Sequence, residues 1–379
     1  MTHKERIMAA LSHEQPDQVP LDLGGTINSS IVAEGYDRLK QHFGVREKNI
    51  ALNLMMRVVH VNENILKALD IDTRTVTMWA PRDGQGDTLY ADAYKDMWGA
   101  ERVRPEGGYY FDQRHFPLSG EISPSDIEKY PWPDPDAPIH TKGLRDEVRW
   151  VRENTDCAVV LYVPPPFIHL SQFLRGFQDW YLDFVLNTKI FDMLSDAVLE
   201  RTMRMAKNVL QEVGQEVDVV LCCDDLGAQN GLQISRDHYL KYVKPRHAKY
   251  FRQIHDLSPA KLLFHCCGSV AGIIEDLIET GVDALNPVQV STAGMNPKAL
   301  KEKYQGRMAF WGGIDSQQVL PMGSVKDVKS AVEKTIEQMG EGGGYILSAV
   351  HNIQPDVPLE NILAMFQHAR EYVPSFAKA

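Results

Sequence analysis

The chain has 379 residues, of which 44% are hydrophobic and 24% are charged, and its formal net charge is -11. This composition is typical of a globular protein with a large core, and the acidic balance argues against sequence-independent binding to nucleic acid, which requires clustered Lys and Arg. The start of the chain lacks the apolar region of a secretory signal, and no apolar run approaches the roughly 20 residues that a membrane span needs. We therefore expect a cytoplasmic protein with no membrane or nucleic-acid partner.

Short apolar runs recur along the chain and predict strands. Most of them are continuous rather than alternating, which is expected where both faces of a parallel sheet are covered. The eight predicted strands are 18–24, 73–79, 157–163, 217–223, 261–267, 282–287, 308–312 and 345–350.

Amphipathic segments lie in the intervals between these strands and predict helices. Start signals recur, such as Asn296-Pro297, where proline suits the first turn. The predicted helices are 34–42, 143–153, 178–213, 235–256, 273–280, 297–304, 325–340 and 358–372. Eight strands alternating with helices favour a single α/β domain over residues 1–379, a (β/α)8 TIM barrel, with a doubly wound open sheet as the alternative.

Residues 81–118 depart from this rhythm. The segment is rich in Gly, Asp, Tyr and Arg and shows short alternating stretches with no helical period. It predicts antiparallel β-hairpins inserted between barrel units, which would serve as a lid or a docking surface and would suit a homodimer.

Soft ligand-type side chains follow two of the predicted strands. The strand at 261–267 ends in His265-Cys266-Cys267, and alternation along a strand places His265 and Cys267 on one face and Cys266 on the other. His351 follows the last strand. Three such ligands would hold zinc and leave its fourth position open, as catalytic zinc sites require. The alternative is that these residues complete the strands without a metal.

Other polar and aromatic side chains also lie near the carboxyl ends of strands, where TIM barrels carry their active sites. We expect Asp225 to orient the substrate or a metal ligand, although Asp224 and Asp225 would also suit a helix cap. Tyr162 and Phe167 are either stacking surfaces for an aromatic substrate or parts of the core. The predicted substrate-binding residues are Asp22, Tyr162, Phe167, Gln229, Asn286, Gln289 and Asp315.

Three segments resemble the uroporphyrinogen decarboxylase-like superfamily: residues 5–25, His265-x-Cys267-Gly268, and Pro355-x-x-Pro358-x-Glu360-Asn361. Within it, the chain looks most like the zinc- and corrinoid-dependent methyltransferases, which include methylcobamide:coenzyme M methyltransferases and the methyltransferase components of O-demethylases. The resemblance runs from residue 5 to about residue 373. It implies a barrel that uses zinc and works with a corrinoid, the cobalt cofactor related to cobalamin.

Two departures from the family pattern bear on the reaction. The decarboxylases hold the propionates of their substrate with arginines after the first strand, whereas residues 22–28 of this chain contain none. The coenzyme M enzymes have a cysteine where this chain has His351. A zinc ion with one thiolate instead of two is more strongly Lewis acidic, which favours polarising the oxygen of a methyl ether.

The sequence therefore predicts a zinc-dependent methyltransferase that moves a methyl group from a small-molecule donor, such as a methyl ether, to a cobalt(I) corrinoid. The chain has no Asp-x-His-x-x-Gly corrinoid signature, so the corrinoid is expected on a separate protein. The alternative reactions are thiol methylation from methylcobamide and decarboxylation of a tetrapyrrole. A non-enzymatic barrel that binds a corrinoid or another small ligand is the alternative outside the enzymes.

Overall fold

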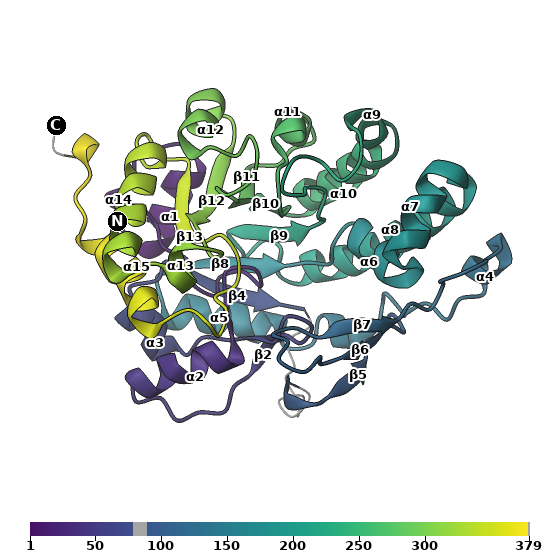
Figure 1. The fold of residues 1–379 in the computed structure, drawn as a ribbon, viewed down its shortest axis with the longest axis horizontal. Helices are drawn as coiled ribbons and strands as arrows, with labels where there is room; N and C mark the ends of the chain where they lie inside the picture. Colours follow the sequence, from purple (N-terminus) through teal and green to yellow (C-terminus); the bar gives the residue numbers. More distant parts are fainter. Residues whose placement is uncertain (79–88, 378–379) are drawn as a thin grey trace.

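The computed structural model describes residues 1–78 and 89–377 (Figure 1). In this part of the chain, seven parallel strands form one curled sheet in the order β13-β12-β11-β10-β9-β8-β4. Their bounds are β4 (Thr73–Thr77), β8 (Ala158–Tyr162), β9 (Val219–Cys223), β10 (Lys261–His265), β11 (Ala284–Val288), β12 (Ala309–Ile314) and β13 (Tyr345–Ala349).

The first predicted strand is the exception, because residues 18–24 form only a one-residue parallel bridge, Leu21 to Leu347. The Asp22 N–H donates to the Leu347 carbonyl and the Leu347 N–H donates to the Pro20 carbonyl, each over 2.9 Å, while the Asp72 N–H reaches the Leu21 carbonyl at 3.0 Å. The segment thus lies between β13 and β4 and completes the barrel. It stays short because Pro20 has no N–H to donate and Gly24, at φ 73°, turns the chain away.

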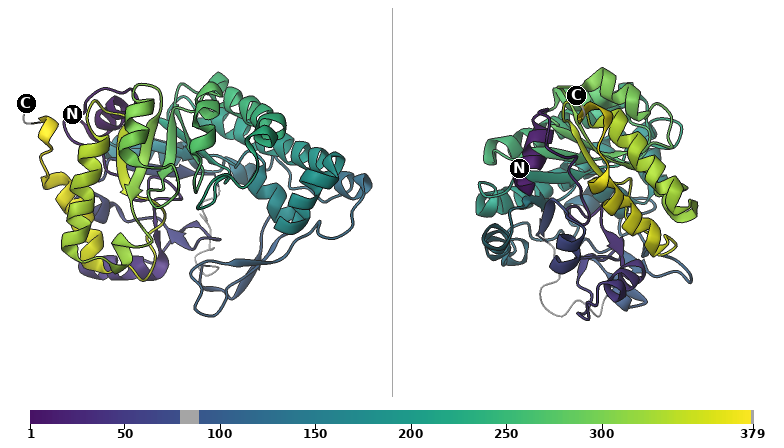
Figure 2. Two further views of the ribbon diagram at one scale, coloured as in Figure 1. Left: turned by 45° about the horizontal axis from the view of Figure 1, so that its top comes forward. Right: turned by 90° about the vertical axis from the view of Figure 1, so that its left-hand side faces the viewer.

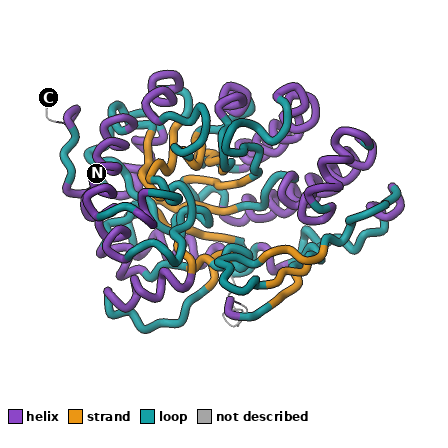
Figure 3. Tube along the Cα trace, in the orientation of Figure 1, coloured by secondary structure: helices purple, strands orange, loops and turns teal. Residues whose placement is uncertain are grey.

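Helices surround the sheet (Figure 3). The predicted helix 178–213 is in fact two, α7 (Phe177–Leu186) and α8 (Thr188–Val213), which meet at Asn187, where φ -137° and ψ 59° are not helical. None of the helices in the described residues is both long enough and apolar enough to cross a membrane. The helices around the sheet include α2 (Ala33–His42), α3 (Glu63–Ala68), α5 (Leu144–Asn154), α6 (Ile168–Arg175), α7, α8, α10 (Lys244–Leu257), α11 (Ile274–Glu279), α12 (Pro297–Tyr304), α14 (Val325–Met339) and α15 (Leu359–Glu371). The shorter helices are α4 (Pro124–Glu128), α9 (Arg236–His238) and α13 (Val319–Met322).

Both faces of the strands are buried, as their continuous apolar sequences predict. On β8, Val160 and Tyr162 belong to the core inside the barrel, while Val159 and Leu161 belong to the core beneath the helices. Helix α1 (His3–Leu11) contributes Ile7, Ala10 and Leu11 to the inner core. It therefore closes the end of the barrel where the strands begin, which we call the floor, and the opposite end is the mouth.

The predicted hairpins form a three-stranded antiparallel sheet, β5 (Ala93–Lys95), β6 (Glu101–Val103) and β7 (Asp112–His115), that projects beside the barrel (Figure 2). Residues 81–88 of the predicted insertion lie outside the described residues. A second small sheet, β1 (Ile31–Val32), β2 (Ala51–Asn53) and β3 (Val58–Val59), was not predicted, since strands of two or three residues are too short to show a pattern. The insertion contacts the loop between β2 and β3 of this second sheet, because the Phe111 N–H donates to the Met55 carbonyl over 2.8 Å.

Candidate metal centre

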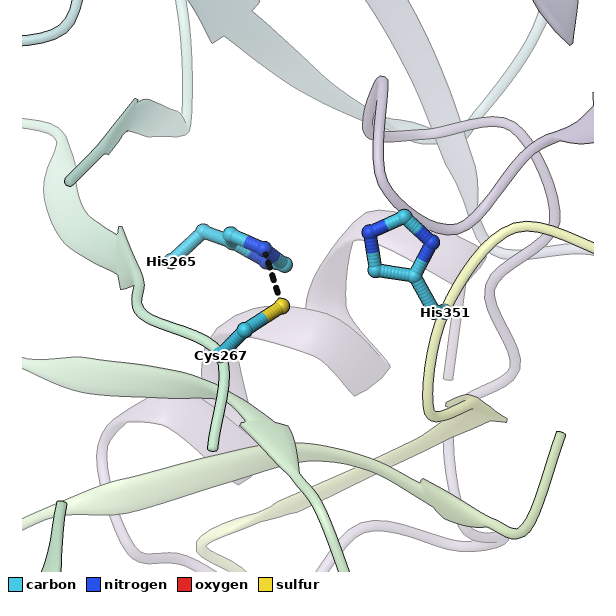
Figure 4. A group of neighbouring side chains, drawn as sticks. All are labelled: His265, Cys267 and His351. Atoms are coloured by element: carbon cyan, nitrogen blue, oxygen red, sulfur yellow. Dashed lines mark hydrogen bonds between the residues drawn. The ribbon is translucent and has the colours of Figure 1, made fainter. Parts of the chain in front are cut away.

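His265 is the last residue of β10, and Cys267 is the second residue of the loop that follows. The His265 Nε2 and the Cys267 Sγ are 3.2 Å apart, and both project into the barrel mouth (Figure 4). Cys266 lies on the other side, in the core beneath the helices, where its sulfur accepts the Leu226 N–H at 3.2 Å. The predicted alternation of these three side chains is confirmed.

His351 reaches the same space from the loop after β13 (Figure 4). One ligand atom from each of His265, Cys267 and His351 lies within 4.8 Å of the other two. The rings of His265 and His351 lie edge to face, with a centroid distance of 5.7 Å and an angle of 65° between their planes. Two imidazoles and a thiol are donors that zinc prefers, so the chemistry of this set fits a zinc ion.

Asn286 fixes which nitrogen of His265 is available. The Asn286 Nδ2 donates to the Trp311 carbonyl over 3.2 Å, which leaves its Oδ1 facing the His265 Nδ1 at 2.5 Å. An amide oxygen can only accept, so Nδ1 carries the proton and Nε2 presents a lone pair to the centre. This is the outer support that metal-binding histidines usually have.

Burial keeps the centre uncharged without a metal. It lowers the pKa of His351 to about 4, with a further contribution from the nearby His265, and it also lowers the pKa of His265. Burial raises the pKa of Cys267 well above its ordinary value. The two imidazoles therefore offer lone pairs at neutral pH, whereas the thiol would release its proton on binding a metal.

The loops after β9 and β10 touch so closely that only glycine fits between them. A Cβ on Gly227 would lie 2.4 Å from the Cys267 carbonyl oxygen, and one on Gly268 would lie 2.4 Å from the Gly227 carbonyl carbon. This approach lets Asp225 Oδ1 accept the Cys267 N–H over 2.7 Å, at 4.0 Å from the His265 Nε2. Asp225 thus holds the backbone of the loop that carries the candidate ligand Cys267.

His169, in α6, is a neighbour of this site that the sequence reasoning missed. Its Nε2 lies 3.3 Å from the Asp225 Oδ2, and its Nδ1 lies 3.4 Å from the Cys223 carbonyl oxygen. Burial opposes charging both groups, yet each stabilises the charge of the other, so the pKa of His169 is raised and that of Asp225 is lowered. The mouth therefore holds an imidazolium and carboxylate pair beside the uncharged ligand set.

The insertion supplies a second missed residue, Tyr110. Its hydroxyl lies 3.4 Å from the His351 Nδ1 and accepts a hydrogen bond from the Gln354 Nε2 over 2.7 Å. Tyr110 lies in the Gly-Gly-Tyr-Tyr-Phe stretch of 107–111, whose aromatic content was a signal, although nothing in it indicated contact with His351. The hairpin sheet is thus connected to the candidate centre.

Asp22 and Phe167 are placed away from open space at the mouth. Buried Asp22 accepts from the Gly25 N–H (2.8 Å) and from the Ser29 hydroxyl (2.6 Å), and two further donors, the Thr73 hydroxyl and the Trp311 indole, complete its set. Phe167 has no exposed surface, and its N–H donates to Asp224. Asp22 organises the turn after the first barrel segment, and Phe167 packs in the core.

The remaining predicted residues lie at the mouth. Tyr162 is 5% exposed, with its hydroxyl 3.7 Å from the Cys223 Sγ, so it lines the barrel interior. Gln289 accepts the Gly268 N–H over 2.7 Å and reaches the exposed Gln229 at 3.4 Å. Asp315 instead accepts the N–H groups of Gln317 and Gln318, at 2.6 and 2.8 Å, and so caps its own turn.

Comparisons with known proteins agree with this architecture. A family model described as uroporphyrinogen decarboxylase (URO-D) matches residues 115–372, more than half of the chain. Similar curated proteins include "Methylcobamide:CoM methyltransferase MtaA" of Methanosarcina barkeri, 24% identical over 200 residues (52% of this chain and 53% of that protein), and "Uroporphyrinogen decarboxylase" of Methylococcus capsulatus, 24% identical over 201 residues (52% and 51%). The chain thus spans about half the length of the curated relatives it matches.

A solved structure, "methyltransferase from Methanosarcina mazei", shares the fold with a TM-score of 0.68 and 17% identity, covering 98% of this chain and 99% of that one. This likeness shows that the barrel as a whole, and not only the segment matched by the family model, follows a known architecture.

Proposed function

We propose that this chain, which belongs to the uroporphyrinogen decarboxylase family, is a zinc-dependent methyltransferase that moves a methyl group from a methyl ether to the cobalt(I) corrinoid of a separate protein. The observation that carries the proposal is the convergence of His265, Cys267 and His351, whose ligand atoms lie within 4.8 Å of one another. Three protein ligands leave one position of a tetrahedral zinc site for substrate.

The composition of the ligand set supports the direction of transfer. When bound, zinc with one thiolate and two imidazoles would act as a Lewis acid toward the ether oxygen. Asn286 keeps the Nε2 lone pair of His265 directed into the site, and Asp225 holds the backbone of Cys267. The chain's own contribution is therefore to fix the ligands and to place the ether oxygen beside them.

The methyl transfer would break one bond to the methyl carbon and form another. The methyl carbon to oxygen bond breaks and the oxygen keeps that electron pair. The new bond from carbon to cobalt would use the electron pair of cobalt(I) in the corrinoid substrate, which the partner protein would supply. The alkoxide or phenolate that leaves would take a proton from solvent.

Thiol methylation is the second candidate, because the similar Methanosarcina barkeri protein is named for methyl transfer between methylcobamide and coenzyme M. It is the weaker one, since His351 supplies an imidazole and the described mouth has a single thiol in its ligand set. Decarboxylation of a tetrapyrrole is disfavoured because residues 22–30 bring no cation to the mouth.

The test combines a cobalt(I) corrinoid with methyl ethers and follows methylcobalt formation by its absorption spectrum. Protein stripped of metal is compared with the same protein after zinc is restored, and a parallel reaction offers a thiol with methylcobamide. We expect methylcobalt only with zinc and the ether. Full transfer by the metal-stripped protein would refute the proposal, and consumption of the thiol alone would establish the second candidate.

A further inference from the structure

We propose that Asn28 is a specificity-determining residue, which recognises a methyl donor carrying a hydroxyl group next to its ether oxygen. This inference rests on the proposed function and names its substrate class more closely. Asn28 lies in the loop after the first barrel segment, is 5% exposed, and places its Nδ2 3.2 Å from the His265 Nε2. It was not among the residues singled out from the sequence.

The hydrogen-bond network fixes the orientation of the Asn28 amide. The His265 Nδ1 carries the proton because it faces the Asn286 oxygen, so Nε2 can only accept. Asn28 must therefore turn its NH2 group, not its oxygen, toward Nε2. Its Oδ1 is buried and has no hydrogen-bond partner among the residues that the structure describes.

A metal ion bound to the His265 Nε2 would take away the hydrogen-bond acceptor of the Asn28 Nδ2. The Nε2 lone pair cannot bind zinc and accept from Asn28 at the same time, and Nε2 is the atom that His265 offers to the centre. The zinc-loaded protein would then leave both a donor and an acceptor of Asn28 unpaired at the ligand set. Buried polar groups are rarely left in that state, because their desolvation is not repaid.

The turn around Asn28 does not require its side chain. The backbone N–H of Asn28 donates to the Thr26 hydroxyl over 3.1 Å, and the same hydroxyl accepts the Ser29 N–H over 2.9 Å. Ser29 in turn donates to Asp22. The loop is thus held by other residues, and the Asn28 amide is available for a ligand.

A complementary ligand must present an acceptor and a donor side by side. An ether oxygen would accept from the Asn28 Nδ2, and a hydroxyl on the adjacent carbon would donate to its Oδ1. 2-Methoxyphenol has this pair, whereas methoxybenzene has the ether oxygen alone. Sites built around such paired contacts discriminate strongly, because the ligand that lacks one group leaves the protein atom unpaired.

The experiment measures binding rather than turnover. Calorimetry with 2-methoxyphenol and methoxybenzene is carried out on zinc-loaded wild type and on Asn28→Leu, which keeps the size of the side chain without its polar atoms. Asn28→Ala is the second variant, in case leucine disturbs the loop. We expect wild type to prefer 2-methoxyphenol by about tenfold or more, and both variants to lose most of that preference while retaining zinc.

The metal-free wild type supplies the second readout. There the Asn28 donor is occupied by His265, so the preference for 2-methoxyphenol should be smaller than in the zinc-loaded protein. A preference that is unchanged in both variants, equal affinities for the two probes in wild type, or no binding of either probe would each overturn the inference. Failure of the proposed function would show separately, as loss of zinc binding or of methylcobalt formation in wild type.

Discussion

Two clusters in the described residues bring a histidine, a cysteine and a third ligand-type side chain together, one at each end of the barrel. At the floor they are His3, Asp156 and Cys157. The ring nitrogens of His3 are both engaged, Nδ1 with Asp156 at 2.6 Å and Nε2 with Asp70 at 2.8 Å, and the Cys157 Sγ faces the Ile71 carbonyl at 3.6 Å. At the mouth, the His265 ring contacts the side-chain amides of Asn28 and Asn286 and the Cys267 sulfur, and the His351 ring lies beside the Tyr110 hydroxyl.

The difference lies in the neighbours and not in the residue types. The carboxylates at the floor are paired with cations. Asp72, for example, lies 2.6 Å from Arg6 and 2.5 Å from Arg370, so its oxygen lone pairs already accept hydrogen bonds from the protein. At the mouth, the two candidate ligand imidazoles, His265 and His351, are uncharged because burial lowers their pKa values, and Asn286 holds the His265 ring in place. The floor groups are thus satisfied within the protein, whereas the mouth leaves coordinating atoms that the proposed zinc ion would use.

Replacing one cysteine from each cluster should give the largest difference in zinc content. Cys267→Ala removes a proposed ligand, and we expect zinc content to fall from about one per chain to near zero. Cys157→Ala is the matched control, because Cys157 lies in the floor cluster, and it should leave zinc content unchanged. Elemental analysis of both purified variants beside wild type measures this. If Cys157→Ala lost its zinc and Cys267→Ala kept it, the zinc site would be at the floor and the proposal would be wrong.

Disrupting the floor should damage stability without affecting the metal. In Asp72→Asn, the buried guanidinium of Arg6 and the half-buried one of Arg370 lose their shared counter-charge but keep Asp17 and Asp70, and we expect the free energy of unfolding to fall by about 1.5–3 kcal/mol. His351→Ala, a change at the mouth, should cost the metal-free protein far less. Urea unfolding of metal-free samples checks both. If the two variants lowered the free energy of unfolding equally, the floor would not be more important for stability than the mouth, and the contrast would be wrong.

Removing the hydrogen-bond acceptor of His265 should weaken zinc binding less than removing a ligand does. In Asn286→Ala the ring loses the acceptor that fixes its proton on Nδ1, so zinc affinity is expected to weaken by about 10- to 100-fold. Competition with a chromogenic chelator measures the affinity. Gln305→Ala, on the surface near the floor, is the control, and a similar loss of affinity there would argue against a specific role for Asn286.

The floor should also show a small pH dependence. Burial lowers the pKa of Lys301 from 10.5 to about 8, and its amino group donates to the Gly343 carbonyl. Because the folded pKa is the lower one, the unfolded chain binds the extra proton between about pH 8 and 10.5, and stability gains about 1 kcal/mol per pH unit there. The stability difference between wild type and Lys301→Met, from urea unfolding, should therefore grow in favour of wild type over this interval. A flat difference would contradict the assignment.

Local rules were sufficient to predict much of this molecule. Strand period placed His265 and Cys267 on one face, and continuous apolar runs such as 217–223 predicted strands buried on both sides. The strand at 18–24 was overestimated because its short pairing depends on Pro20 and on a partner more than 300 residues away. Tyr110, Asn28 and His169 approach the centre only through the insertion, a turn and a helix start, contacts that no local pattern encodes.

The central claim is that one zinc ion is bound by one thiolate and two imidazoles at the mouth. X-ray absorption at the zinc edge of the purified protein tests it most directly. We expect one sulfur neighbour at about 2.3 Å together with nitrogen or oxygen neighbours at about 2.0 to 2.1 Å, and imidazole scattering that weakens in His351→Ala. A zinc ion with two or more sulfur neighbours, or one whose imidazole scattering is unchanged in His351→Ala, would contradict the account.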